Sequence, residues 1–136
     1  MRIALDTNVQ VSAYTARGLS ADVFCYILVD HDLVLSEQVL REFARTLETK
    51  FGVPKKYVAE IVRELRQHHV ERLPTGDIRF EIVKDLDDRI VLQSAISARA
   101  EVLITGDRDL TNVSEQDTEI RVLTPREFWE SLRTSK

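Results

Sequence analysis

Two aspartates directly follow short apolar stretches of the sequence. Asp6 comes after RIAL (2–5), and Asp107 comes just after EVLIT (101–105). Such apolar runs are typical of buried strands in a parallel sheet. Parallel strands end at the same edge of the sheet, and ligands bind there in open α/β folds. We therefore expect both carboxylates at one edge, although the first strand alone favours Asp6 as a cap of the following turn or helix.

A third carboxylate, Asp88, lies in the first turn of a predicted helix. It shares a face with Val91, Leu92 and Ala95, the apolar face that must pack on the sheet. Acidic residues at a helix start also complement the helix dipole. That alternative explains Asp85, the expected cap, better than it explains Asp88.

Several carboxylates at one edge would repel each other and raise some of their pKa values. A hard divalent cation removes this penalty, and Mg²⁺ takes oxygen ligands while keeping several waters. One or two Mg²⁺ or Mn²⁺ ions would orient a phosphodiester, activate a water for attack and stabilise the leaving oxygen. Zinc is disfavoured, because Cys25 is isolated and His68 and His69 are adjacent on a predicted helix. No nucleophilic serine, cysteine or histidine arrangement is present, so a metal-activated water is the simplest hydrolytic mechanism.

The composition is that of an ordinary globular domain. The chain has 136 residues, 43% hydrophobic and 31% charged, with four glycines and three prolines. This predicts a single domain, 1–136, without a linker. No apolar run is long enough for a membrane span, so no membrane partner is expected. Cys25 is the only cysteine; it excludes an internal disulfide, is expected to pack in the core and fits a cytoplasmic location.

The net charge of −4 is unusual for a protein that binds nucleic acid. It is less unusual if several acids surround bound cations, which would cancel much of the local charge.

Short apolar strands alternate with helices along the chain. This order predicts an α/β fold, a three-layer α/β/α sandwich with a mostly parallel central sheet. The stretch 73–84 is ambiguous, with a turn followed by either a short helix or a strand. The expected strands are 2–5, 33–36, 101–105 and 120–123. The expected helices are 21–30 capped by Ser20, 37–51 capped by Ser36 and ended by Gly52 and Pro54, 55–69, 86–100 capped by Asp85, and a last one opened by the capping box Thr124–Pro125–Arg126–Glu127.

Two of these helices have a distinct apolar face. In 37–51, Glu42 sits just off the apolar stripe, and periodicity alone does not select it over Glu37 or Glu48. In 55–69, a basic face could follow an RNA backbone, or it could be the ordinary solvated side of the helix, since Glu60 and Glu64 border it. The apolar face of 37–51 comprises Val39, Leu40, Phe43, Leu47 and Phe51. The apolar face of 55–69 comprises Tyr57, Val58, Ile61, Val62 and Leu65. Its basic face comprises Lys55, Lys56, Arg63 and Arg66, with Lys50 nearby.

Four stretches in order, IALDTNV, LVLSEQVLREF, DLDDRIVLQSA and AEVLITGDRDL, resemble the PIN-domain ribonucleases. The closing IRVLTPREF is similar to the end of the bacterial branch described as toxins of toxin–antitoxin pairs. Each stretch is a weak signal alone, but their order and spacing are specific. The sequence departs from the pattern of that branch at two positions: Leu86 replaces a frequent proline, and Gln10 replaces an apolar residue. Neither change removes an acidic residue.

The resemblance implies a PIN-like fold and cleavage of single-stranded RNA with Mg²⁺ or Mn²⁺. It also implies a cognate antitoxin as partner and, together with the apolar stretch 19–29, a homodimer. A degenerate domain that only binds RNA or protein is one alternative. An aspartate-dependent phosphotransfer enzyme is another, disfavoured because position 8 is Asn and no lysine follows a later strand. Carried over by position, the acidic site is Asp6, Glu42, Asp88 and Asp107, with Asp109 as a less certain metal ligand and Asn8 and Thr105 as supporting polar residues.

Overall fold

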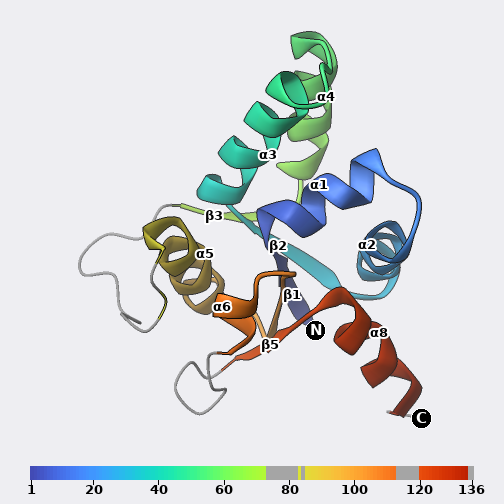
Figure 1. Cartoon of the computed structure of the whole chain (residues 1–136), viewed down its shortest axis with the longest axis vertical. Helices are drawn as coiled ribbons and strands as arrows, with labels where there is room; N and C mark the ends of the chain where they lie inside the picture. The colour runs from blue at the N-terminus through green and yellow to red at the C-terminus, as the bar shows by residue number, and fades with distance from the viewer. Residues whose placement is uncertain (73–82, 84, 113–119, 135–136) are drawn as a thin grey trace.

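The short apolar runs form one parallel sheet. The computed structural model describes residues 1–72, 83, 85–112 and 120–134. Within this part of the chain, five strands pair in the order β3-β2-β1-β4-β5, and every pairing is parallel (Figure 1). The ambiguous stretch 73–84 lies almost wholly outside the described residues. The strands are β1 (Arg2–Leu5), β2 (Asp32–Ser36), β3 (His69–Glu71), β4 (Val102–Ile104) and β5 (Arg121–Leu123).

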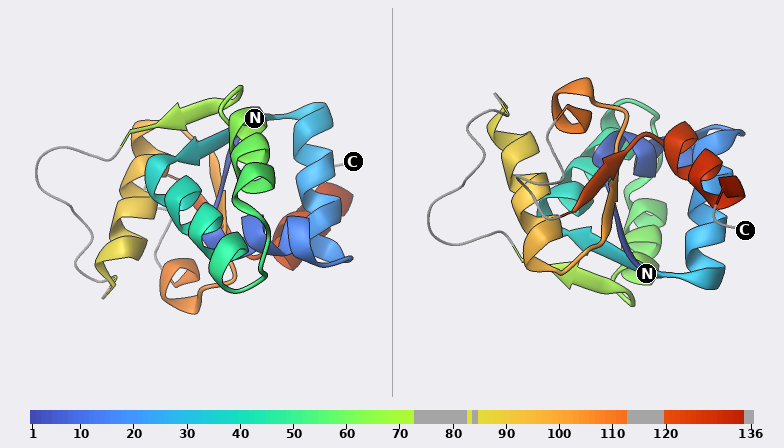
Figure 2. Two further views of the ribbon diagram at one scale, coloured as in Figure 1. Left: turned by 90° about the horizontal axis from the view of Figure 1, so that it is seen from above. Right: turned by 90° about the horizontal axis from the view of Figure 1, so that it is seen from below.

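Helices connect the strands and cover both faces of the sheet, which confirms the three-layer α/β/α fold (Figure 2). Alternation along β1 shows the two faces: Ile3 and Leu5 pack in one hydrophobic core, and Ala4 packs in the other. The first core involves α1, α2, α3, α4 and α8, and the second involves α5, α6 and Val39 of α3. The described helices are α1 (Thr7–Thr15), α2 (Leu19–Asp30), α3 (Glu37–Thr49), α4 (Lys55–Leu65), α5 (Leu86–Ser97), α6 (Arg108–Thr111) and α8 (Pro125–Thr134).

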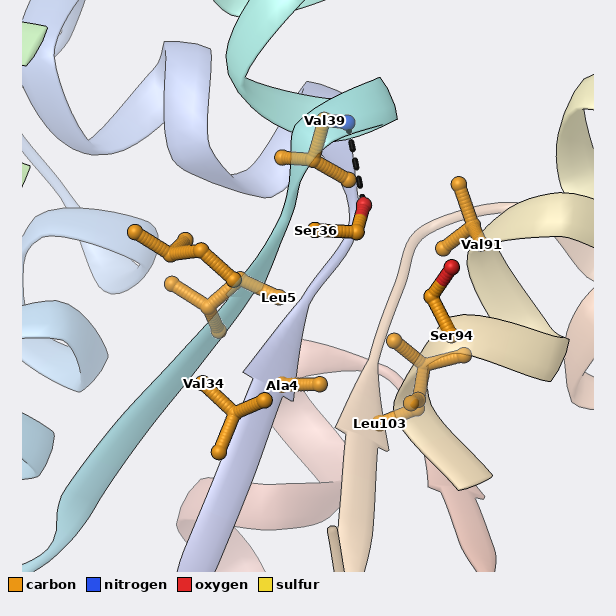
Figure 3. Close-up of a pocket in the computed structure, with 10 residues that line it drawn as sticks. Ala4, Leu5, Val34, Ser36, Val39, Val91, Ser94 and Leu103 are labelled. Atoms are coloured by element: carbon orange, nitrogen blue, oxygen red, sulfur yellow. Dashed lines mark hydrogen bonds between the residues drawn. The ribbon is translucent and has the colours of Figure 1, made fainter. Parts of the chain in front are cut away.

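Three of the expected helix caps are present. The Ser36 hydroxyl accepts a hydrogen bond from the Val39 amide at 3.1 Å (Figure 3). The Asp85 carboxylate accepts from the amides of Asp87 and Asp88 at 2.8 and 3.3 Å. The capping box of α8 is reciprocal, with distances of 3.0 and 3.1 Å between Thr124 and Glu127. These local signals were sufficient because each cap contacts residues only two or three positions away.

Several local expectations were wrong. Ser20 does not cap α2, because that helix already begins at Leu19 and Gly18 occupies the cap position without a side-chain bond. The helix expected over 55–69 ends at Leu65, and His69 instead begins β3, opposite Val34 of β2. Pairing with β2 satisfies the backbone there, so the strand replaces the last helical turn. Helices α1 and α6 were not predicted as elements, since α1 follows Asp6 with no break after the strand.

Three side chains differ in burial from their expected environment. Cys25 is exposed rather than packed in the core, because α2 turns only its other side toward the sheet. Phe51 and Tyr57 are also largely exposed, at 46% and 48%. Helix α3 ends at Thr49, and Gly52 then reverses the chain with a positive φ of 66°. Phe51 therefore falls beyond the apolar stripe of α3.

The core between β1, β2 and α5 contains a cavity of about 10 Å³ (Figure 3). Ala4, Val34 and Val91 line it together with the Ser94 hydroxyl. This volume corresponds to about one water. The cavity is therefore a packing feature rather than a ligand site.

None of the helices in the described part of the chain is long and apolar enough to cross a membrane.

Gln10 on α1 is fully buried, and neither its amide nitrogen nor its amide oxygen has a hydrogen-bond partner among the described residues. A buried, unpaired amide carries a desolvation cost that a methionine of similar shape avoids. We expect Gln10→Met to raise the free energy of unfolding by about 1–3 kcal/mol. Urea unfolding measures this change. Gln67→Met, at an exposed position, should change stability by less than about 0.5 kcal/mol, and a destabilised Gln10→Met would show that the amide is bonded in solution.

Candidate active site

The register of β1 and β4 places Asp6 beside Thr105. Leu5 pairs with Ile104, so the residues that follow them leave the sheet side by side. The Thr105 hydroxyl donates to Asp6 Oδ2 at 2.6 Å, and the Thr7 amide donates to Asp6 Oδ1 at 2.7 Å. Asp6 is therefore the N-cap of α1, as its alternative interpretation predicted, and it lies at the carboxyl edge of the sheet.

Asp107 joins the same group of hydrogen bonds through Thr105. Its backbone amide donates to the Thr105 hydroxyl oxygen at 3.0 Å, so one hydroxyl links Asp6 and Asp107. The Asp107 carboxylate caps α6 and accepts from the Asp109 amide at 2.9 Å. The two strand-end acids thus lie at one edge, held by the threonine between them.

Asp88 reaches this edge from the start of α5. Burial, a hydrogen bond to the Asp107 carboxylate and repulsion from Asp107 and Asp6 raise the pKa of Asp88 to about 7. The protonated Asp88 carboxyl can share its proton with Asp107, which explains how two acids can be hydrogen-bonded to each other. The apolar face of α5 is buried as expected through Val91 and Leu92, and this packing brings Asp88 to the edge.

The pKa of Asp6 is also raised. Burial is the main cause, since the side chain is only 5% exposed, and the charges of Asp107 and Glu42 raise it further. The hydrogen bonds from Thr105 and Thr7 act in the opposite direction, because they stabilise the ionised carboxylate. The neighbouring donors therefore offset only part of the rise in the pKa of Asp6 that burial causes.

Glu42 lies on α3 and contacts the first residue of α1. Its Oε2 accepts from the Thr7 hydroxyl at 2.8 Å, and its Oε1 accepts from the Gln38 side-chain amide at 2.7 Å. Thr7 therefore contacts Glu42 through its side chain and Asp6 through its backbone. Glu37, which periodicity did not separate from Glu42, instead forms an ion pair with Arg66.

The four acids are connected in pairs rather than assembled around one point. Among the residues that the structure describes, no three acidic, histidine or cysteine side chains are grouped closely enough to hold a metal ion. The expected convergence of all four carboxylates in one cleft is therefore not formed in this arrangement. The physical reason is that protein donors hold Asp6 and Glu42, and that like charges repel.

The donor set nevertheless fits a hard divalent cation. Carboxylate oxygens are the ligands that Mg²⁺ prefers, and the raised pKa values of Asp6 and Asp88 mark a place where positive charge would be stabilising. The remaining sequence candidates, Asn8 and Asp109, are exposed beside Asp6 and Asp107 in the chain. Neither side chain takes part in the described hydrogen bonds.

The basic candidates lie on the hairpin of α3 and α4. Lys50, Lys55 and Lys56 are exposed near the turn between the two helices, at the end away from the sheet (Figure 1). Lys50 lies eight residues beyond Glu42 in the chain, roughly 12 Å along the helix axis, and Glu42 is linked to Asp6 through Thr7. Arg63 is exposed in the last turn of α4, whereas Arg66 forms a bidentate ion pair with Glu37 at 2.7 and 3.1 Å.

Two residues of the site were missed from the sequence. Thr7 and Gln38 both donate to Glu42, and neither was selected. The spacing of Gln38 and Glu42, four positions apart on a helix, was a usable signal, because such pairs are neighbours on the helix surface. The partner of Thr7 depends on the packing of α1 against α3 and leaves no local signal.

The chain belongs to the PIN domain family. The family model matches residues 2–109, which include every acidic candidate of the site. Strand β5 and helix α8 lie beyond the matched part. No curated protein is similar enough in sequence to count as a match.

Solved structures with a similar fold include chains from three organisms. One is VapBC2 from Rickettsia felis bound to a DNA fragment from its promoter, with a TM-score of 0.60, 15% identity and coverage of 90% of this chain and 97% of that one. Another is VapC20 of Mycobacterium tuberculosis, a Sarcin-Ricin loop cleaving toxin, with a TM-score of 0.56, 14% identity and coverage of 83% and 97%. A domain of a functionally unknown protein from Methanocaldococcus jannaschii has a TM-score of 0.54, 19% identity and coverage of 90% and 89%.

The Asp88–Asp107 pair predicts a pH-dependent stability. The pKa of Asp88 rises from 3.8 to about 7 on folding, so its contribution to stability is fully present below pH 3.8 and is lost as the pH rises to about 7. Asp107→Asn removes the repulsion but keeps a capping side chain. We expect this variant, in chelator, to be at least as stable as the wild type at pH 8 and to depend less on pH between 5 and 8.

Urea unfolding across this pH range, with the exposed Asp22→Asn as control, measures the effect. Marked destabilisation of Asp107→Asn at pH 8 would mean that the carboxylate serves mainly as the cap of α6.

Proposed function

We propose that this protein is a divalent-metal-dependent endoribonuclease that hydrolyses phosphodiester bonds of single-stranded RNA. We propose further that the whole chain, 1–136, is a single nuclease domain acting in the cytoplasm as the toxin of a toxin–antitoxin pair. Membership of the PIN domain family supports the proposal. So does the fold shared with a toxin described as cleaving the Sarcin-Ricin loop, an RNA element.

One observation carries the proposal: the acids at the carboxyl edge are joined by the Thr105 hydroxyl and the Asp88–Asp107 hydrogen bond. A purely structural role would need only the caps that Asp6 and Asp107 supply. It does not explain why Asp88 is half-buried against a like charge at an energetic cost. Strain of this kind is concentrated at functional sites.

Mg²⁺ or Mn²⁺ would be held by Asp6, Asp88 and Asp107, with Glu42 and then Asp109 as further ligands. A bound cation of this kind activates a water and stabilises the charge of the leaving oxygen. Thr105 bonds both Asp6 and Asp107 and would limit changes in their separation, and Asn8, exposed in the first turn of α1, would bond the substrate. Asp88 would lose its proton when a cation replaces the hydrogen bond to Asp107.

RNA binding would extend from the acidic edge over the exposed side of the α3–α4 hairpin. Lys50, Lys55, Lys56 and Arg63 are exposed there and can meet phosphates remote from the cleaved bond. Arg66 is the weakest candidate of the basic face, because its guanidinium is already bound to Glu37.

Two protein partners belong to the proposal. The similar VapBC2 structure is a complex with DNA, which supports a cognate antitoxin for this chain. A homodimer is supported by α2, where Leu28 and Val29 are 42% and 81% exposed. Exposed aliphatic side chains next to each other on one helix are typical of an association surface.

Asp6→Asn should reduce RNA cleavage by orders of magnitude, because it neutralises the acid closest to the centre of the site. Asparagine still accepts one of the two hydrogen bonds, so the far-UV circular dichroism spectrum should be unchanged. Cleavage of a labelled single-stranded RNA with Mn²⁺, and with excess chelator, is the measurement, and Asp22→Asn on the exposed side of α2 is the control.

Each alternative gives a different result in this assay. Equal cleavage in chelator would contradict the metal mechanism. RNA binding without cleavage by the wild type would indicate a binding module, and phosphate transfer to an aspartate would indicate a phosphotransfer enzyme.

Val29→Asp should weaken the dimer, since it places a charge on the most exposed aliphatic side chain of α2. Light scattering at several protein concentrations would show a dimeric wild type and a variant shifted to the monomer. Ala59→Asp, exposed on α4, should leave the mass unchanged. A monomeric wild type at all concentrations would contradict the dimer.

A further inference from the structure

Both carboxylate oxygens of Glu42 are held by uncharged donors from two different helices. We propose that Gln38 and Thr7 are positioning residues that together orient this carboxylate toward the acidic edge and thereby set the affinity of the site for a divalent cation. The inference rests on the proposed function. It adds two residues that act through Glu42 and do not themselves contact the cation.

Gln38 holds Glu42 along the axis of α3. The two residues are four positions apart, and the side-chain amide of Gln38 donates to Glu42 Oε1 at 2.7 Å. Both side chains are half-buried, so water competes less for this bond than on an exposed helix face. A long, flexible glutamate is thereby restricted to one orientation.

Thr7 holds the other oxygen and connects it to Asp6. Its hydroxyl donates to Glu42 Oε2 at 2.8 Å, and its amide donates to Asp6 Oδ1 at 2.7 Å. Thr7 is 5% exposed and lies in the first turn of α1, directly after the strand. The distance between the two acids is therefore controlled by one rigid residue.

The chemistry of the donors distinguishes this arrangement from a structural ion pair. Each carboxylate oxygen has two lone pairs, so one donor on each oxygen leaves the other lone pairs available. Glutamine and threonine carry no charge, so among the described residues the donors of Glu42 do not neutralise its carboxylate. Glu37, on the same helix, shows the contrast: Arg66 binds both of its oxygens and neutralises it.

The first test is the affinity for Mn²⁺, measured by calorimetry and by the rise in melting temperature. Gln38→Met keeps the length of the side chain and its helix propensity but removes the donor. Loss of a residue that orients a metal ligand costs roughly 10–100-fold in metal affinity, and we expect the lower part of that range. Gln67→Met, exposed beyond the end of α4, is the matched control and should bind Mn²⁺ like the wild type.

A double-mutant cycle shows whether Gln38 acts through Glu42. In a Glu42→Gln background, Gln38→Met should cause no further loss of Mn²⁺ affinity, because the carboxylate it orients is gone. Thr7→Val and Thr7→Ser form a second pair. The serine keeps the hydroxyl and should retain Mn²⁺ affinity, whereas the valine should lose affinity although its backbone bond to Asp6 is intact.

The outcomes separate this inference from the proposed function. A wild type that binds no Mn²⁺ overturns both. If the wild type binds Mn²⁺ and both Gln38→Met and Thr7→Val bind it with unchanged affinity, only the positioning role is overturned. The same conclusion follows if these variants are less stable without metal but keep their affinity for Mn²⁺. Weaker Mn²⁺ binding in both variants, with rescue in Thr7→Ser and no effect in the Glu42→Gln background, supports it.

Discussion

Asp6 stands at the end of the central strand with its carboxylate almost fully buried, and burial of a charge is costly unless donors surround it. The molecule supplies these donors from two directions. Thr105 comes from the neighbouring strand end, and the Thr7 amide comes from the start of α1. The Thr105 bond requires the parallel register in which Leu5 lies beside Ile104, whereas the Thr7 amide belongs to the next residue in the chain. A shift of this register would remove the Thr105 hydroxyl from Asp6, so the pairing of β1 with β4 and the environment of the acid depend on each other.

The helices that start at this edge lessen the repulsion among the acids. Asp6 caps α1 and Asp85 caps α5, and Ser36 caps α3 close by. Each helix start presents unpaired amides and a partial positive charge. These dipoles stabilise negative charge locally but do not neutralise it, and burial together with repulsion from neighbouring acids still raises the pKa values of Asp6 and Asp88. The site is therefore stable enough to fold and still favourable for a cation.

The two acids Glu37 and Glu42 of α3 have different hydrogen-bond partners. Arg66 neutralises Glu37 at the base of the α3–α4 hairpin, which ties the end of α4 to the start of α3. Glu42, little more than one turn further along, is held by Gln38 and Thr7 and keeps its charge. The net charge of −4 thus includes carboxylates whose energetic cost would fall if positive charge were bound, which would make an acidic chain compatible with the proposed RNA substrate.

The sequence by itself determined the features that depend on near neighbours. Alternating strands and helices predicted the parallel three-layer fold, apolar runs placed Asp6 and Asp107 at strand ends, and the face shared with Val91 brought Asp88 to the sheet. The resemblance to PIN-domain ribonucleases, rather than periodicity, selected Glu42. Periodicity was sufficient where a cap or a face involves residues only a few positions apart.

Only the tertiary structure decided which donors meet which acids. Thr7 and Glu42 are 35 positions apart, and Thr105 and Asp6 are 99 apart. Such contacts depend on how α1 packs against α3 and on which strands pair, and these follow from the shapes of many side chains together. The same long-range packing exposed Cys25, ended α4 early so that β3 could pair with β2, and buried Gln10 without a described partner. No pattern within a few residues contains that information, because the energy that decides it comes from contacts between distant segments.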